Sequence, residues 1–348
     1  MPRRSSRLTI KQVASAAGVS TQTVSRVINA RPDVSLDTRK RVQSVIEEFG
    51  YQPSALARSL IRQRSYTLGV VTAGLKYIGP SRVLNGIAGA AEGLGYTLLL
   101  KELPQFDAND VYPIFQTLLS RHVDGVIWAV PEIGSNRGFV DRLTLDSDVP
   151  VVFLTMEPRE NLKVVSIDNY AGGRLAVAHL LDQGYRRIGH IAGPLDWWEA
   201  RQRMAAWQDT LREAGLEAGP ENHVEGNWSS ASGAEAFERL FRQYPGMDAV
   251  FVANDQMSLS VVQAACQKGI DIPRDLGVVG FDNISESAYF WPPLTTIEQD
   301  QHGLGKIAVE EMIRMIGIQW TGTAAPAATP VTLSPTLVIR QSSVRPTP

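Results

Sequence analysis

The chain has 348 residues, of which 44% are hydrophobic and 20% charged, and its formal net charge is −2. This length exceeds one ordinary domain, and the apolar content suffices for two or three folded cores. The single cysteine, Cys266, excludes an internal disulfide and fits a reducing compartment. No run approaches ~18 apolar residues, and the basic start lacks the apolar core of a secretion signal. We therefore expect a cytoplasmic protein with no membrane span.

The charge is distributed unevenly along the chain. Residues 1–65 contain twelve Lys and Arg against four acidic residues, a net charge of +8. The remaining 22 basic and 32 acidic residues leave −10 for the rest. A basic head on an acidic body is the electrostatic pattern of a protein that binds a polyanion. A solvated basic surface without a ligand is the alternative.

The head begins with the pattern of two helices joined by a tight turn. Thr9 can cap a first helix that ends near Ala17, and Gly18 can supply the backbone conformation that ends it. Ser20 can cap a second helix over Thr21 to Asn29. This is the plan of a DNA-reading helix-turn-helix, in which the first turns of the second helix enter the major groove.

The second helix presents polar side chains that suit DNA bases. Arg26 can make a paired contact to guanine and Gln22 to adenine, while Thr21 suits a phosphate or a thymine methyl group. An ordinary helical hairpin with polar residues facing water is the alternative. The predicted DNA contacts of the head are Thr9, Ser20, Thr21, Gln22, Ser25, Arg26 and Asn29.

A third helix and a conditional fourth follow. Ser35 can cap a helix over Leu36 to Phe49, whose Val42, Val45, Ile46 and Phe49 are expected to close the small core. After the extended residues around Pro53, Ser54 can cap a helix that reaches Leu60. A helix this short is marginal alone in water, where ~12–15 residues are usually needed, so it forms only when something holds it.

The segments VSTQTVSRVIN, VSLDTRKRV, YQPSALARSL and LGVVT are similar to those of the LacI/GalR family of bacterial transcription repressors. The resemblance runs along essentially the whole chain. It implies that the short helices of two subunits pair in the minor groove, where Ser54, Ala57 and Leu60 contact DNA. Leu60 would be the apolar wedge that bends the DNA, and Ala57 is small enough for close helix approach. From its own sequence, Leu60 could equally be the first core residue of the next domain.

From Tyr66 onward, strands and helices alternate, which predicts a doubly wound parallel sheet. The pattern then restarts, because RRIGHIAGPL (186–195) repeats TLGVVTAGL and MDAVFVAND (247–255) repeats VDGVIWAVP. Two similar α/β lobes with a cleft between them are the periplasmic-binding-protein-like arrangement. The expected elements of the first lobe are strands at 68–75, 96–100, 123–130 and 150–155 and helices at 79–94, 111–120 and 137–144.

The resemblance implies that the chain crosses between the lobes three times, near 162–168, 288–296 and 318–328. The segment Leu294 to Gly317 then returns to the first lobe, and the last strand, VTLSPTLVIR, completes the second. The predicted domains are a helix-turn-helix domain (1–52), a hinge helix and linker (53–65), lobe 1 (66–165 plus 294–324) and lobe 2 (166–293 plus 325–341).

Ligands of open α/β sheets lie at the carboxyl ends of the strands, so the cleft is the expected pocket. By the resemblance, Arg203, Trp228, Asn254, Asp255 and Asp282 match ligand-contacting positions of the family. Thr155 departs from the family pattern, which has a sugar-contacting aspartate there in some members, and this weakens any specific prediction of galactosides. We expect Trp207 and Trp320 in the core. The predicted ligand-binding residues are Tyr77, Pro80, Trp128, Thr155, Trp197, Arg203, Trp228, Asn254, Asp255 and Asp282.

Flat rings with an arginine, an aspartate and an asparagine suit a sugar or glycoside as effector, although a purine-like corepressor would also stack on these rings. No cofactor is expected. A sugar-acting enzyme would need paired carboxylates or a base and nucleophile, and the five histidines show no such spacing. A solute-binding protein would not need the basic head. We therefore expect a regulator that binds a near-palindromic DNA operator as a homodimer; the residues do not distinguish an inducer from a corepressor.

Overall fold

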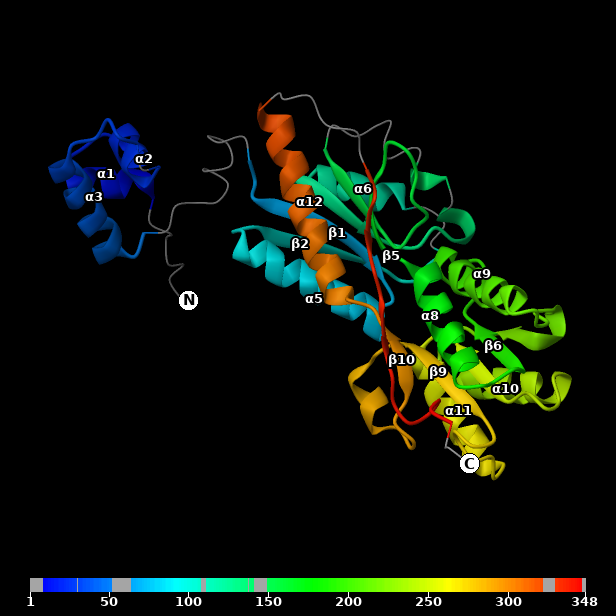
Figure 1. Cartoon of the computed structure of the whole chain (residues 1–348). Coiled ribbons are helices and arrows are strands. Elements are labelled where there is room, and N and C mark those ends of the chain that lie inside the picture. Colours follow the sequence, from blue (N-terminus) through cyan, green and yellow to red (C-terminus); the bar gives the residue numbers. More distant parts are fainter. Residues whose placement is uncertain are drawn as a thin grey trace, which may run out of the picture. The chain divides into compact units, whose positions relative to one another are not determined.

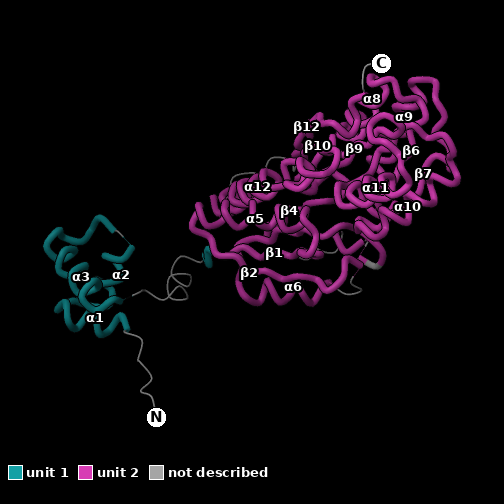
Figure 2. Tube along the Cα trace, turned by 90° about the horizontal axis from the view of Figure 1, so that it is seen from below, with its two compact units in different colours: residues 1–66 teal, residues 67–348 magenta. Residues whose placement is uncertain are grey.

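The computed structural model describes residues 9–29, 31–51, 64–107, 111–136, 138–140, 149–321 and 329–345. Figure 1 traces their helices and strands. They fall into two units, residues 1–66 and residues 67–348 (Figure 2). The predicted hinge residues Ser54, Ala57 and Leu60 lie outside the described residues, as does most of the helix expected at 137–144.

Three helices form the head, and local sequence signals set their ends. The Ser20 hydroxyl accepts a hydrogen bond from the Thr23 N–H at 3.1 Å, and Ser35 caps the third helix in the same way. Gly18 ends the first helix at φ 64°, in the left-handed region that favours glycine. The helices are α1 (Ile10–Ala17), α2 (Thr21–Ile28) and α3 (Leu36–Phe49).

The core of the head differs from the expectation at one position. Val42 is fully buried, and Val45 and Ile46 pack against the core, as expected. Phe49 is 37% exposed, so its predicted core role is wrong. Gly50 adopts the left-handed conformation and ends α3, so the chain changes direction there. Tyr51, which follows, is buried in the core of the head, where Phe49 was expected.

The body contains two six-stranded sheets in its described residues, and we call the halves built on them lobe 1 and lobe 2. The sheet order is β11-β5-β4-β3-β1-β2 in lobe 1 and β12-β10-β9-β8-β6-β7 in lobe 2. Neighbouring strands run parallel except for the antiparallel pair of β10 and β12. The central strands are buried on both faces, as parallel strands covered by helices must be. The predicted doubly wound fold is confirmed.

The elements of lobe 1 are β1 (Thr67–Ala73), α5 (Ile78–Gly93), β2 (Thr97–Leu103), α6 (Tyr112–Leu119), β3 (Gly125–Ala129), η1 (Gly134–Asn136), β4 (Val151–Leu154), β5 (Lys163–Ile167), α12 (Gln301–Thr321) and β11 (Val331–Leu333). Those of lobe 2 are α8 (Asn169–Asp182), β6 (Ile188–Ala192), α9 (Trp198–Glu213), η2 (Pro220–Asn222), β7 (His223–Glu225), α10 (Ser230–Gln243), β8 (Ala249–Val252), α11 (Asp255–Gln267), β9 (Gly277–Asp282), η3 (Ser285–Tyr289), β10 (Thr295–Glu298) and β12 (Thr336–Val338).

The sheet pairings correct two predicted boundaries. Strand β10 pairs with β9, so residues 295–298 belong to lobe 2, and only α12 returns to lobe 1, where it packs along α5 (Figure 1). The Thr295 and Thr296 hydroxyls explain this placement, because they donate to Arg340 O and to the Asp255 carboxylate of lobe 2. The last predicted strand is divided: β11 pairs with β5 in lobe 1 and β12 with β10 in lobe 2.

Two tryptophans were expected in the core. Trp207 is a fully buried residue of α9 that packs against the lobe 2 sheet and helix α8, and its indole N–H donates to Ile188 O at 3.2 Å. Trp320 is 47% exposed on the last turn of α12, so its predicted burial is wrong. The helix extends beyond the sheet that it covers, as Figure 1 shows.

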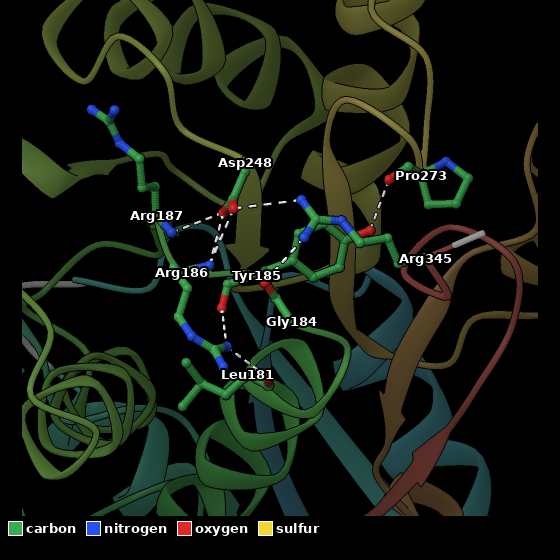
Figure 3. A network of polar contacts seen from close by, with 8 residues as sticks. All are labelled: Leu181, Gly184, Tyr185, Arg186, Arg187, Asp248, Pro273 and Arg345. Atoms are coloured by element: carbon green, nitrogen blue, oxygen red, sulfur yellow. Dashed lines mark hydrogen bonds and ion pairs between the residues drawn. The ribbon is translucent and has the colours of Figure 1, made fainter. Parts of the chain in front are cut away.

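Arg345, near the C-terminus, contacts Asp248 and Tyr185 of lobe 2 (Figure 3). Asp248 accepts hydrogen bonds from the backbone N–H groups of Arg186 and Arg187 and forms an ion pair of 3.6 Å with Arg345. The Arg345 guanidinium also lies 4.5 Å from the centre of the Tyr185 ring. Residues 339–345, which follow β12, are therefore part of the lobe 2 fold.

Candidate functional site

A cavity lies between the lobes, at the carboxyl ends of the strands. It encloses about 1120 Å³, including the part that opens to solvent. The segments after β1, β4, β6 and β8 and the last residue of β9 all reach it, as expected for parallel sheets. The predicted ligand residues that line it are Tyr77, Pro80, Thr155, Trp197, Arg203, Trp228, Asn254 and Asp282.

Two predicted ligand residues do not line the cavity. Trp128 is 2% exposed and packs on Phe139 inside the lobe 1 core. Side chains alternate along a strand, and the side chain of Trp128 points to the face covered by α6, together with its strand neighbours Val71 and Phe153.

Asp255 is fully buried, is not among the residues that line the cavity, and has its own partners. Its carboxylate accepts hydrogen bonds from Ile284 N–H at 3.0 Å, from Ser287 Oγ at 2.7 Å and from Thr296 Oγ1 at 2.6 Å. Burial raises the pKa of Asp255 to about 6, although these donors favour the charged form. These hydrogen bonds hold η3 and β10 against helix α11, so the role of Asp255 is structural.

Arg203 is held rigidly at the floor of the cavity. Its Nε donates to Asn169 Oδ1 at 2.9 Å, and Nη1 donates to Ala253 O. The guanidinium carbon lies 3.8 Å from the centre of the Phe281 ring and 5.5 Å from that of Trp228. Burial lowers the pKa of Arg203, and the nearby carboxylates oppose that shift. A planar cation fixed in this way can make directed hydrogen bonds to a ligand.

Two acidic side chains line the cavity near Arg203. Burial raises the pKa of Asp282 to about 7, and the Arg203 charge and a hydrogen bond from Gln299 limit the rise. Burial likewise raises the pKa of Glu199, on the first turn of α9, to about 7. Glu199 was not predicted as a site residue, because its approach to the cavity depends on how α9 is set against the sheet.

We expect Glu199→Gln to gain stability relative to the wild type as the pH rises from 5 to 8. A carboxyl whose folded-state pKa lies above its unfolded value stabilises the fold at low pH and loses that contribution as the pH passes the folded value. A shift from 4.5 to about 7 corresponds to at most ~3 kcal/mol. Urea unfolding at both pH values measures the difference, with the exposed Glu235→Gln on α10 as control. If the difference in the free energy of unfolding between Glu199→Gln and the wild type does not change with pH, the pKa of Glu199 is not raised.

The cavity gathers polar atoms that have no partner within the described chain. Buried polar groups are ordinarily hydrogen-bonded, so a cluster of unpaired ones is a place where a bound molecule can supply hydrogen-bond partners. Most of the unpaired atoms accept hydrogen bonds, which suits a ligand rich in hydroxyl groups. The unpaired atoms on cavity residues are Thr155 Oγ1, Ser166 Oγ, Glu199 Oε2, Trp228 Nε1, Gln256 Oε1 and Gln301 Oε1.

Three cavity residues also have strained backbones. Thr155, Trp228 and Asp282 have φ angles of 56°, 71° and 117°. Such angles are unusual for residues with a side chain, above all for β-branched threonine, and each costs about 1–3 kcal/mol. Strain of this kind persists where the surrounding fold enforces it, and it often occurs at ligand sites.

Aromatic rings form a row across the cavity. Trp228 meets Trp197 at 5.7 Å between ring centres, and Trp197 meets Phe106 of lobe 1 at 4.8 Å. Phe106 lies 5.9 Å from Tyr77. Phe106 was not predicted as a site residue, because it follows β2 in a loop with no strand-end motif. The row supplies flat apolar surfaces contributed by both lobes.

The predicted DNA-contacting residues of the head lie on α2, at both of its caps and at the N-cap of α1. Thr21, Gln22 and Arg26 are exposed on α2, and Arg26 forms an exposed ion pair of 3.3 Å with Asp33. Asn29 is half-buried, and its side chain donates to Ser25 O at 2.8 Å. Of the other predicted contacts, Thr9 and Ser20 are the exposed N-caps of α1 and α2, and Ser25 is half-buried.

The described residues offer neither a metal site nor a membrane span. They contain no group of three or more His, Cys, Asp or Glu side chains that could hold a metal ion. No helix among them is long and apolar enough to cross a membrane.

Residues 9–54 match the model of bacterial regulatory proteins of the lacI family, and residues 177–343 match a periplasmic binding protein-like domain. The transcriptional repressor PurR of Haemophilus influenzae (strain PittEE) is 33% identical, over 96% of this chain and 98% of its own. The lactose operon repressor of Escherichia coli K12 is 32% identical, over 88% and 84%. The solved Lac repressor dimer, bound to operator and the anti-inducer ONPF, has a TM-score of 0.87 at 31% identity, covering 97% of this chain and 100% of that one.

A helix-turn-helix head on a two-lobed ligand-binding body defines a DNA-binding regulator of transcription. The chain belongs to the LacI family of bacterial regulatory proteins. Its relatives are repressors, so the chain is a regulator rather than a sugar-acting enzyme or a solute-binding protein.

Proposed function

We propose that this protein represses transcription by binding a near-palindromic operator as a homodimer, and that a sugar or glycoside in the interlobe cavity controls that binding. The observation that carries the proposal is the cavity itself, which combines unpaired polar atoms with aromatic rings on both lobes. A ligand that contacts both lobes favours one lobe arrangement and thereby shifts the population of DNA-binding states.

The chemistry of the cavity favours a sugar over a nucleobase. A sugar and a nucleobase could both stack on the Trp228 ring, because each has a ring face that can pack against an aromatic ring. Sugar hydroxyls can donate to the unpaired acceptors Glu199 Oε2, Gln256 Oε1 and Gln301 Oε1. Arg203 can then donate to the remaining oxygens of the ligand. A nucleobase has fewer donors and would leave several of these acceptors unpaired.

Dimerisation is proposed from the family and from the geometry of DNA. The related Lac repressor is a dimer on its operator. One α2 helix reads only a few base pairs, so two heads on two half-sites are needed for a specific site. We also place the protein in the cytoplasm, where a regulator of transcription meets bacterial DNA.

The test uses the full-length protein and two measurements. Selection from randomised duplex DNA should yield a near-palindromic site, and fluorescence anisotropy then gives the affinity for it. A thermal-shift screen with sugars, glycosides and nucleobases identifies the ligand, because a ligand that binds the folded state raises the melting temperature. The proposal requires that a sugar or glycoside raise the melting temperature and change the operator affinity. A nucleobase with both effects would overturn the proposed ligand class.

We expect Arg26→Ala to relax the base preference at one position of each half-site. Loss of a paired contact to guanine costs about 1–3 kcal/mol of discrimination against the wrong base. Repeating the selection with the variant measures this. Arg41→Ala, an exposed arginine on α3, is the control, and it should weaken binding equally for all sequences or leave it unchanged. If the Arg26→Ala variant keeps the base preference of the wild type, Arg26 does not take part in base recognition.

A further inference from the structure

The turn between α2 and α3 places an acidic residue beside the predicted guanine contact. Nη1 of Arg26, on α2, lies 3.3 Å from Oδ2 of Asp33, and both side chains are about half exposed. The head as a whole is basic, with twelve Lys and Arg against four acidic residues in residues 1–65. Phosphates of DNA are attracted to basic side chains, so an acidic group at this place opposes binding to DNA of any sequence.

The backbone of the turn determines where Asp33 lies. The Arg31 N–H donates to Arg26 O at 3.0 Å, which folds the chain back over the end of α2. The Arg39 guanidinium of α3 donates to Arg31 O at 2.6 Å. On the other side of Asp33, Val34 packs against the core of the head. Because the turn is held before and after Asp33, its contact with Arg26 follows from the path of the chain.

The ion pair is compatible with guanine recognition by Arg26. A guanidinium carries its N–H groups in a planar fork, so Nη1 with Nη2 forms one edge and Nη2 with Nε forms another. Asp33 contacts Nη1. The two N–H groups of the Nε–Nη2 edge point the same way, and they match O6 and N7 of guanine. An arginine held through Nη1 can therefore still make the paired contact to the base.

A partner for Arg26 changes what the side chain does when DNA approaches. A long arginine side chain loses much rotamer freedom when it is ordered, and a restraint that exists before binding reduces that loss. Without the restraint, the guanidinium can also turn to a phosphate, and such a contact carries no sequence information. The negative charge of Asp33 disfavours the phosphate and leaves the base as the remaining partner.

We propose that Asp33 is a specificity-determining residue that positions Arg26. Asp33 directs the Nε–Nη2 edge of Arg26 to a guanine and keeps the guanidinium away from nearby phosphates. Its charge lowers the affinity for all DNA, while the restraint raises the preference for guanine at one position of each half-site. This inference rests on the proposed function and deepens it, because it requires that Arg26 contacts a base.

The experiment uses the full-length protein, the selected operator, and a duplex in which the guanine identified by Arg26→Ala is replaced with adenine. Fluorescence anisotropy gives the affinity for each duplex and for a random duplex at several salt concentrations. Asp33→Asn should lower the ratio of guanine to adenine affinity by about threefold or more. It should also bind the random duplex more tightly, because the released Arg26 can reach a phosphate. One such contact steepens the dependence of log Kd on log salt by about 0.9 per head.

Three further variants distinguish positioning from a general effect of charge. Asp33→Glu keeps a carboxylate and should retain most of the guanine preference. Glu48→Gln removes the same charge from an exposed position on α3 and should leave the ratio of guanine to adenine affinity unchanged. The double variant of Arg26→Ala and Asp33→Asn should show the ratio of Arg26→Ala alone, because Asp33 acts through Arg26.

The fold of the head should not change in these variants. An exposed ion pair contributes little to stability, so Asp33→Asn should keep the melting curve of the wild type in circular dichroism. A loss of guanine preference in a protein that melts normally then reports on DNA recognition rather than on folding.

The outcomes separate this inference from the proposed function. If Asp33→Asn keeps the guanine preference of the wild type, Asp33 does not position Arg26, and the inference is overturned. A changed preference at a position that Arg26→Ala does not affect would show that Asp33 contacts a base itself, which also overturns it. In both cases the operator is still recognised, so the proposed function stands. If no specific DNA site can be selected with the wild type, the proposed function and this inference fail together.

Discussion

Replacement of Arg203 with methionine is expected to abolish the ligand response and to lower the free energy of unfolding of the body by about 3–5 kcal/mol at pH 8. The methionine keeps apolar contact with Phe281 but leaves the buried Asp282 and Glu199 without their cation. At pH 5 both carboxyls are protonated, so the loss should fall to that of the hydrogen bonds to Asn169 and Ala253, about 1–3 kcal/mol.

Urea unfolding of the full-length protein at pH 5 and pH 8 measures this difference, and anisotropy on the selected operator measures the ligand response. Arg212→Met is the matched control, because Arg212 lies exposed on the same helix and forms an ion pair of 3.4 Å with the exposed Asp209. An exposed pair of this kind contributes little. An equal loss of stability at both pH values, or a normal ligand response, would show that Arg203 does not balance the cavity carboxyls.

Asp255→Ala is expected to be the most destabilising single change in lobe 2. It leaves the donors on Ile284, Ser287 and Thr296 buried without an acceptor, and each unsatisfied group costs about 1–3 kcal/mol. The total approaches the whole stability of an ordinary domain, about 5–15 kcal/mol. We expect a lowered melting temperature and a poor yield of folded protein, measured by calorimetry and circular dichroism.

The comparison variant is Asp282→Asn, because Asp282 lines the cavity and Asp255 does not. Asp282→Asn removes a buried charge while keeping the shape of the side chain, so it should change ligand affinity more than stability. If the Asp255→Ala protein folds with a normal melting temperature but does not bind the ligand, Asp255 is a ligand contact rather than a structural residue.

The elements that depend on local signals could be predicted closely. Helix α3 has the predicted bounds, because a serine cap starts it and a left-handed glycine ends it. The lobe to which β10 belongs could not be predicted in the same way. Its residues would suit either sheet, and the choice depends on hydrogen bonds to Asp255 and Arg340, which are distant in sequence.

The cavity shows the same division between local and distant information. Asp282 stands at the end of β9, where parallel strands bring their ends together, and this agrees with its predicted place in the cavity. Arg203 lies on α9, and it was found by its match to a ligand-binding position of the family. Trp128 also stands near a strand end, but the pleat of the strand turns it into the core. Phe106 and Glu199 line the cavity because of how the elements that carry them pack against their neighbours. No short sequence motif indicates that packing.

The interleaved path of the chain also sets the order in which the protein can fold during synthesis. The head is complete once residue 51 has been made, so it can fold long before the body. Lobe 1 must wait, because α12 and β11, which complete it, come from residues 301–333. Until then the face of α5 that α12 later covers stays exposed on the nascent chain. A truncated product can therefore contain a folded DNA-binding head while its ligand site is incomplete.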